Sequence, residues 1–204
     1  MVLIKRLFLL IPFLLAGAVN AQDRCGTVLY EQQLQNLNPS RKNTNQFEDW
    51  IKTKLNQKKL LSSTNRTAAA TYTIPVVVHV IHNGEAIGTG GNISLAQINS
   101  QIAVLNEDFK RLNTDASNTP AEFLPVAGNL DIEFILAKQD PAGLPTTGIL
   151  RVNGNKSSWA MTDNSNLKAL SYWPAEDYLN IWVTNLSGTL LGYAQFPPTD
   201  GLSG

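Results

Sequence analysis

One stretch of β-branched residues constrains the fold of this chain more than any other feature. It reads Ile74-Pro-Val-Val-Val-His-Val-Ile-His82 and has the length and composition of a β-strand. Pro75 cannot donate a hydrogen bond within a sheet, but it stands near the start of the run, where proline is tolerated. We therefore expect a strand over residues 74–82.

A helix is predicted after this strand. Ser94-Leu-Ala-Gln97 has the pattern of a capping box, in which each of the two outer side chains accepts a hydrogen bond from the other residue's main-chain N–H. Apolar residues then recur at intervals of three and four, the spacing of one helix face: Leu95, Ile98, Ile102, Leu105 and Phe109. We expect a helix over residues 95–111.

Further elements follow. Residues 130–136 alternate apolar and polar, which predicts a strand with one solvated face, and Asp140-Pro-Ala-Gly143 predicts a turn. Residues 178–184 and 190–196 predict two more strands, and residues 166–172 a short helix. From Thr67 onwards the pattern is that of an α/β domain.

The first 21 residues have the pattern of an export signal. Lys5-Arg6 precede an apolar run from Leu7 to Leu15, and small residues end at Ala21, after which we expect cleavage. The protein is therefore predicted to be secreted. The apolar run falls short of the about 20 residues of a membrane span, so no membrane attachment is expected after cleavage. A lipoprotein with acylated Cys25 would need small residues where Asp23-Arg24 stand.

The charges divide the exported chain into two parts. Residues 22–66 carry eight basic and four acidic side chains, a net of +4, whereas residues 67–204 carry six and twelve, a net of −6. The two parts attract each other. Phe47, Trp50, Ile51 and Leu55 predict one short amphipathic helix in the basic part, which ends in a polar linker of the kind that proteases cut. Composition leaves two interpretations open, a propeptide and an ordinary N-terminal extension.

Composition and spacing exclude several functions. The net charge of zero leaves no basic surface for nucleic acid. His79 and His82 stand three apart on a strand, so they point to opposite faces and cannot bind one metal ion; we expect one to pack inside and the other to hydrogen-bond at the surface. Gly88-Thr-Gly-Gly91 lacks the third glycine of a dinucleotide-binding loop. Gly201-Leu-Ser-Gly204 lacks the further glycine and the histidine of a serine hydrolase.

Cys25 is the only cysteine, so the chain can form no internal disulfide. A thiol in an exported protein is open to oxidation unless something occupies it. A thiolate binds zinc well and could fill the open position of a catalytic zinc, displacing the water that attacks substrate. The alternative is a thiol without a function. Without further context, a lone cysteine favours this alternative.

Several stretches carry a family resemblance: Ile74–His82, Asn106-Glu-Asp-Phe109, Gln139-Asp-Pro141 with Thr147-Gly-Ile149, and, most specifically, Tyr178-Leu-Asn-Ile-Trp-Val183 and Leu191-Gly-Tyr-Ala-Gln-Phe-Pro197. Together they resemble the pappalysin family of metzincin zinc endopeptidases, and its ulilysin-like secreted bacterial members in particular. Arg24-Cys-Gly-Thr27 resembles the propeptide cysteine motif of that family. The resemblance covers nearly all of residues 74–197.

The resemblance implies a zymogen with a signal peptide (residues 1–21), a propeptide (22–66) and the N-terminal part of a catalytic domain (67–204). The domain would be a metzincin-like upper subdomain, a twisted mixed β-sheet with backing helices. Cys25 would bind the catalytic Zn²⁺ in the latent form, and cutting near Arg66 would release it. Gly192, Tyr193 and Ala194 would belong to the strand that pairs with protein or peptide substrates. A Ca²⁺ requirement stays open.

One departure from the family is severe. Its catalytic helix carries His-Glu-x-x-His-x-x-Gly-x-x-His, with three zinc-binding histidines and a glutamate that acts as general base on the zinc-bound water. This sequence has no such motif, and its two histidines do not match it. We therefore expect a truncated sequence, with no catalytic residue in the chain and no activity of the chain alone. The competing hypothesis is a secreted α/β binding module without chemistry.

Overall fold

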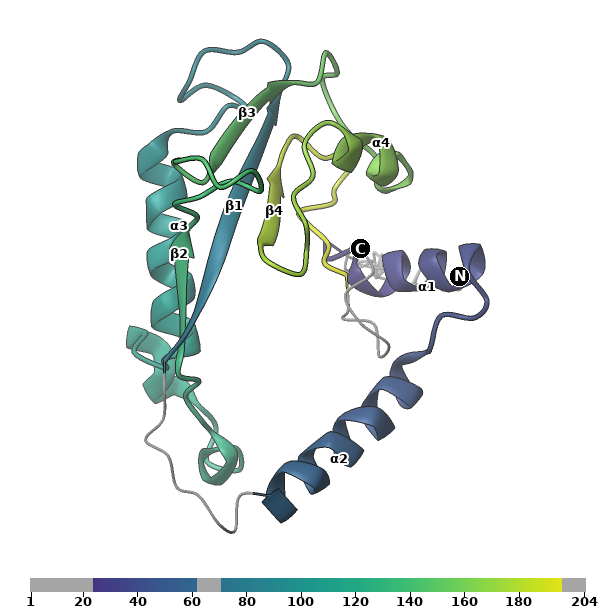
Figure 1. Ribbon diagram of the computed structural model, residues 1–204, viewed down its shortest axis with the longest axis vertical. Coiled ribbons are helices and arrows are strands. Elements are labelled where there is room, and N and C mark those ends of the chain that lie inside the picture. The colour runs from purple at the N-terminus through teal and green to yellow at the C-terminus, as the bar shows by residue number, and fades with distance from the viewer. Residues whose placement is uncertain (1–23, 62–70, 196–204) are drawn as a thin grey trace, which may run out of the picture.

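A computed structural model describes residues 24–61 and 71–195 (Figure 1). Two helices precede the first strand of a central sheet, and the other strands and helices follow along the rest of the chain. In order the elements are α1 (Thr27–Leu37), α2 (Thr44–Leu61), β1 (Tyr72–His82), α3 (Leu95–Phe109), η1 (Thr114–Asn118), η2 (Leu124–Val126), β2 (Ile132–Leu136), β3 (Ile149–Asn153), η3 (Met161–Asp163), α4 (Asn164–Ala169) and β4 (Leu179–Val183). The expected α/β fold class is confirmed.

β1 is the central strand of a four-stranded sheet. β2 pairs with its first half, from Tyr72 to Val76, and β3 with its second half, from Val78 to His82. β4 pairs with the middle of β1 and therefore lies on the other edge (Figure 1). The resemblance implies a mixed sheet, but all the pairs among these four strands are parallel, because crossovers rather than tight hairpins connect them.

α3 covers one face of the sheet. The predicted capping box begins this helix: Gln97 N donates to Ser94 Oγ (3.2 Å), and Ser94 N donates to Gln97 Oε1 (2.9 Å). Ile98 is buried on the inner side of the helix and packs against one face of β1 and β2, made of Val76, Val78, Val80 and Phe134. Each such aliphatic side chain contributes about 1.5–3 kcal/mol to folding when fully buried.

The other face of β1 is covered by aromatic residues from the C-terminal half of the chain. Val77 packs with Trp173, and Ile81 packs with Trp159 and with Leu167 of α4. β1 is thus enclosed on both sides, which explains why its sequence is apolar without alternation.

Several of the predicted helices and strands differ from those in the structure. β3 is not predicted by the sequence analysis, α1 is missed, and α2 is longer than the short helix expected around Trp50. The strand expected over residues 190–196 is, in its described part, a single bridge at Gly192. The expected cleavage sites, after Ala21 and near Arg66, and the end of that strand at Phe196, lie outside the described residues. None of the helices in the described ranges is long and apolar enough to cross a membrane.

Candidate functional site

The segment that follows β4 presents its main chain to the N-terminal segment. Leu191 N donates to Arg24 O (2.8 Å), and Gly26 N donates to Gly192 O (2.9 Å), so that Cys25 and Gly192 pair as residues of neighbouring parallel strands do. Ala194 N donates to the hydroxyl of Thr27 (3.0 Å). Two segments at opposite ends of the described chain therefore lie side by side, and Figure 1 shows α1 next to the yellow C-terminal segment.

Residues 191–194 therefore offer main-chain groups in the way that an edge strand does, and we call this segment the edge. The N–H and C=O groups of an edge strand bind an extended chain through the main chain, and this is how many proteins bind peptides. Here residues 24–27 of the same chain use those groups. A second peptide cannot bind the same atoms at the same time, so the N-terminal segment blocks this edge.

The structure brings four predicted site residues together. Gly192 pairs with Cys25, Ala194 bonds to Thr27, and Tyr193 contacts α1. The Cys25 side chain is exposed at this edge, and its Sγ–H donates to Thr27 Oγ1 (3.4 Å). The geometry thus places the single thiol of the protein on the strand expected to hold substrate.

Gly26 is buried where the N-terminal segment crosses the domain. A Cβ atom on this residue would lie 2.8 Å from Leu190 Cδ1, 3.4 Å from Met161 Sδ and 3.4 Å from Tyr193 Cβ. The first distance is shorter than real carbon contacts allow, so any side chain at residue 26 would force the Leu190 side chain to move.

A second contact, which the sequence analysis missed, joins α1 to the domain through two tyrosines and an asparagine. Asn164 Nδ2 donates to the hydroxyl oxygen of Tyr30 (2.6 Å), and the hydroxyl of Tyr193 donates to Asn164 Oδ1 (3.1 Å). The two tyrosine rings are 4.9 Å apart and tilted by 54°. Burial raises the pKa of both phenols further above neutral pH, so both keep their proton, and in this contact the Tyr193 hydroxyl donates while the Tyr30 oxygen accepts. In the sequence, the only signal for this contact is that Tyr30 is an aromatic residue next to a polar, Gln-rich stretch.

Arg41 ties the chain after α1 back onto that helix. Its Nε and Nη2 atoms donate to the two carboxylate oxygens of Glu31, at 2.8 and 2.9 Å, and Gln35 adds a third hydrogen bond at 3.2 Å. Glu31 is 8% exposed, and the hydrogen bond from Arg41 lowers the pKa of its carboxyl group. Because such two-pronged pairs fix geometry well, this pair holds the chain after α1 against the helix.

The described residues do not themselves provide a metal site. Within ranges 24–61 and 71–195, no three His, Cys, Asp or Glu side chains lie together so that they could hold a metal ion. His79 is fully buried, and both of its ring nitrogens are engaged, with Ser171 Oγ (2.9 Å) and Asn180 Oδ1 (2.8 Å). His82 accepts from Gly84 N (3.0 Å) at the half-buried end of β1. The expected division of roles between the two histidines is confirmed, and no zinc-dependent step follows from these residues.

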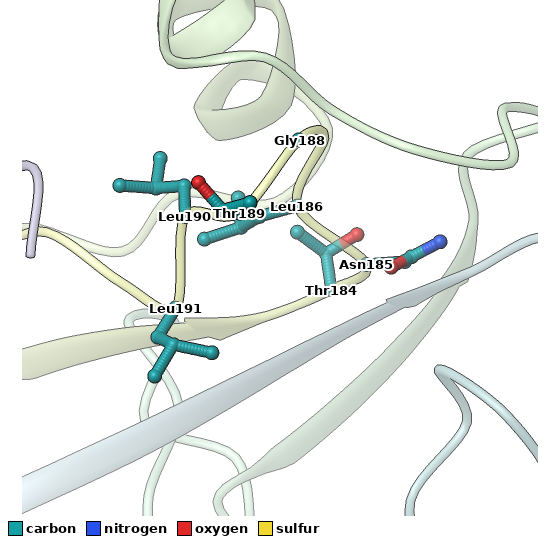
Figure 2. Close-up of a pocket in the computed structure, with 7 residues that line it drawn as sticks. All are labelled: Thr184, Asn185, Leu186, Gly188, Thr189, Leu190 and Leu191. Atoms are coloured by element: carbon teal, nitrogen blue, oxygen red, sulfur yellow. The ribbon is translucent and has the colours of Figure 1, made fainter. Parts of the chain in front are cut away.

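A cavity of about 360 Å³ lies beside the edge, in the loop between β4 and Leu191 (Figure 2). Its lining combines hydroxyl, amide and aliphatic groups from Thr184, Asn185, Leu186, Gly188, Thr189, Leu190 and Leu191. Leu190 and Leu191 point to opposite sides in Figure 2, as successive residues of an extended chain do. The loop is held by main-chain bonds with Trp159, at 2.8 Å to Asn185 O and 2.9 Å from Ser187 N.

The parallel sheet and its helices match the metzincin-like fold, and comparison with solved structures supports a metzincin-type metalloprotease. Mature mirolysin of Tannerella forsythia, in complex with a cleaved peptide, is 51% identical with a TM-score of 0.56, over 63% of this chain and 48% of that chain. Mirolysin in complex with compound 9 is 52% identical with a TM-score of 0.56, over the same shares.

A promirolysin mutant from Tannerella forsythia is 44% identical with a TM-score of 0.61, over 85% of this chain and 54% of that chain. This chain thus spans about half the length of the mirolysin structures that it matches. No protein-family model and no curated protein sequence matches it.

Proposed function

We propose that this chain is the N-terminal portion of a secreted, zinc-dependent metalloendopeptidase zymogen of the pappalysin family. Residues 1–21 are its export signal, residues 22–66 its propeptide, and residues 67–204 the first part of its catalytic domain. Protein or peptide substrates bind along Gly192, Tyr193 and Ala194. The propeptide keeps the enzyme latent until the chain is cut near Arg66 and the N-terminal fragment leaves.

One observation carries this proposal. The main chain of residues 24–27 occupies the edge formed by residues 191–194, through two main-chain hydrogen bonds and one from Ala194 N to the Thr27 hydroxyl. A segment in this position competes with substrate for the same atoms. This is the relation that a propeptide needs, and an ordinary N-terminal extension would have no reason to adopt it.

The comparisons support the division of the chain. The aligned share rises from 63% with the mature mirolysin structures to 85% with the promirolysin mutant. The additional share fits an N-terminal segment that a mature enzyme no longer has. The opposite net charges of residues 22–66 and 67–204 favour the same docked arrangement, more strongly at low salt.

The metal of the proposed enzyme is a catalytic zinc ion. The sequence has two histidines, and both are accounted for in β1. A catalytic zinc would therefore need ligands from outside this sequence, and its chemistry would be the activation of a water molecule for attack on the peptide bond. From this chain, Cys25 would contribute one thiolate ligand in the latent form. A thiol exposed beside Gly192 is suitably placed for that role.

The complete gene product tests the proposal. Its hydrolysis of a fluorogenic peptide is measured before and after the chain is cut next to Arg66 and the N-terminal fragment is removed, with and without a zinc chelator. We expect activity only after removal, and its loss with the chelator. A product that stays inactive after removal, but binds the same peptide, would support the non-catalytic binding module instead.

A further inference from the structure

We infer that residues 24–41 alone dock the N-terminal segment, through a site on the domain built from Asn164, Tyr193, Leu190 and Met161 that accepts a helix carrying one phenol side chain. The segment therefore stays bound after the chain is cut between α2 and β1. This inference rests on the proposed function only in treating that cut as the first event of activation, which departure of the segment completes.

The two N-terminal helices differ in how far their side chains are buried. In α1, Tyr30 is 3% exposed and Glu31 is 8% exposed, although the helix also carries exposed apolar side chains such as Leu37. In α2, the side chains from Thr44 to Lys59 are exposed except for those of Phe47 and Ile51, which are half-buried. Figure 1 shows α1 against the C-terminal segment and α2 extending away from it. Among the described side chains of the two helices, Tyr30 of α1 is thus the one buried against the domain.

The buried contact between α1 and the domain joins two tyrosines through one asparagine. The amide of Asn164 holds both phenols at once, since its nitrogen donates to Tyr30 and its oxygen accepts from Tyr193. An aromatic pair at this separation adds to the energy of area burial, and large aromatic anchors in enclosed sites dominate the energy of many interfaces. Tyr30 is therefore the residue on which docking depends most.

The contacts that dock residues 24–41 do not include α2. The main-chain bonds at Arg24 and Gly26 lie at one end of this segment, and Tyr30 lies one helical turn further along. The pair between Glu31 and Arg41 closes the other end, before α2 begins. A cut in the residues after α2 breaks none of these contacts. It removes only the covalent tether, which had raised the effective concentration of the segment.

The test uses the full chain with a site for a sequence-specific protease inserted next to Arg66. After cutting, the two fragments are run together on a sizing column at about 10 μM, and their affinity is measured by dilution. We expect wild-type fragments to elute as a complex. Tyr30→Ala should weaken the complex at least about 30-fold and Tyr30→Phe about fivefold, because the second variant keeps the ring and loses only the bond from Asn164.

Two variants make the test specific. Trp50→Ala, on the exposed side of α2, is the matched control and should leave the affinity unchanged. Asn164→Ala combined with Tyr30→Phe should weaken binding no more than Asn164→Ala alone, because both changes remove the same hydrogen bond. Near-ultraviolet circular dichroism of the larger fragment confirms that Asn164→Ala leaves the domain folded.

Separation of the wild-type fragments, or a Trp50→Ala effect as large as that of Tyr30→Ala, would overturn the inference. The outcome is independent of the proposed function. Fragments that stay together, with no peptidase activity in the complete gene product even after the N-terminal fragment has been removed, would refute the protease and leave the docking site standing. Fragments that separate at once, with activity appearing, would do the reverse.

Discussion

Cys25 and Gly192 pair as neighbours in a parallel bridge, with Gly26 N 2.9 Å from Gly192 O on one side and Leu191 N 2.8 Å from Arg24 O on the other. This pair places the only thiol of the protein on the edge that would align a substrate. It also joins the basic and the acidic parts of the sequence, so that blocking of the edge and docking of the N-terminal segment are one event.

Gly26→Val should loosen the N-terminal segment. The added side chain meets Leu190 and Met161 at a position where even one Cβ atom lies 2.8 Å from its neighbour. Overpacking of this kind costs about 1–3 kcal/mol, so we expect the Leu191 and Ala194 amides to exchange with solvent at least about fivefold faster. Gly128→Val is the matched control, because nothing lies within 4 Å of a Cβ atom there. Equal exchange in the two variants would contradict the close approach.

Cys25→Ala should separate blocking from thiol chemistry. The variant keeps the main-chain bonds of Arg24 and Gly26, so the edge should stay protected from exchange. In the uncut complete gene product, peptide hydrolysis should rise at least about tenfold, the equivalent of about 1.4 kcal/mol, because the proposed metal ligand is lost and excess peptide can then displace the N-terminal segment more easily. Val28→Ala, an exposed change next to the site, is the control. If the uncut variant stayed as inactive as the wild type, the cysteine would have no part in latency.

Asn106→Ala should destabilise the domain by about 2–3 kcal/mol in urea unfolding. The Asn106 amide donates to Phe134 O (2.9 Å) and accepts from Phe134 N (2.8 Å), so it ties α3 to a buried residue of β2. The substitution leaves both of these main-chain groups without their partner. Gln101→Ala, on the exposed side of α3, should change stability by less than about 0.5 kcal/mol. Similar losses in both variants would refute the role of this amide.

The stability of the domain should fall in acid because of His79. Asn180 Nδ2 donates to Trp173 O (2.9 Å), which turns its oxygen toward the ring, so His79 Nε2 carries the proton and Nδ1 accepts from Ser171. Burial lowers the pKa of His79 below its usual 6.5 in the folded state. The unfolded state then binds the proton more readily. The stabilisation is complete above pH 6.5 and is lost toward the lower folded-state pKa, by up to about 1.4 kcal/mol per pH unit.

Urea unfolding between pH 5 and pH 8, in the wild type and two variants, checks this. His79→Gln should flatten the dependence below pH 6.5, whereas His82→Gln, which removes the only other histidine, should leave it in place. A flat profile in the wild type would show that the buried ring is not the cause.

Local pattern was enough to predict the centre of the fold. The β-branched run became β1, the capping box began α3, and the two histidines of β1 divided as strand alternation requires. These features depend on residues close together in sequence, where periodicity and capping act directly. β3 escaped prediction because its five residues include Arg151, whose guanidinium is half-buried and bonds Asn92 and the carbonyl of Ile93.

The candidate site could be predicted only in part. Resemblance to a family suggested Cys25 and the strand around Gly192, but not that they touch. Their pairing uses main-chain N–H and C=O groups, which almost every residue has, so no pattern of side chains in the sequence predicts it. Tyr30 and Asn164 are 134 residues apart, and each is unremarkable in its own stretch of sequence. The contact that they form with Tyr193 exists only when the N-terminal segment is docked on residues 191–194.

Amide hydrogen exchange at Leu191 and Ala194 tests the central claim most directly. Both N–H groups donate to the N-terminal segment in the structure. They should be protected in the complete gene product, exposed once the N-terminal fragment is removed, and protected again when a non-cleavable peptide is added. Exposure before removal, or a peptide that binds without restoring protection, would mean that propeptide and substrate do not share this edge.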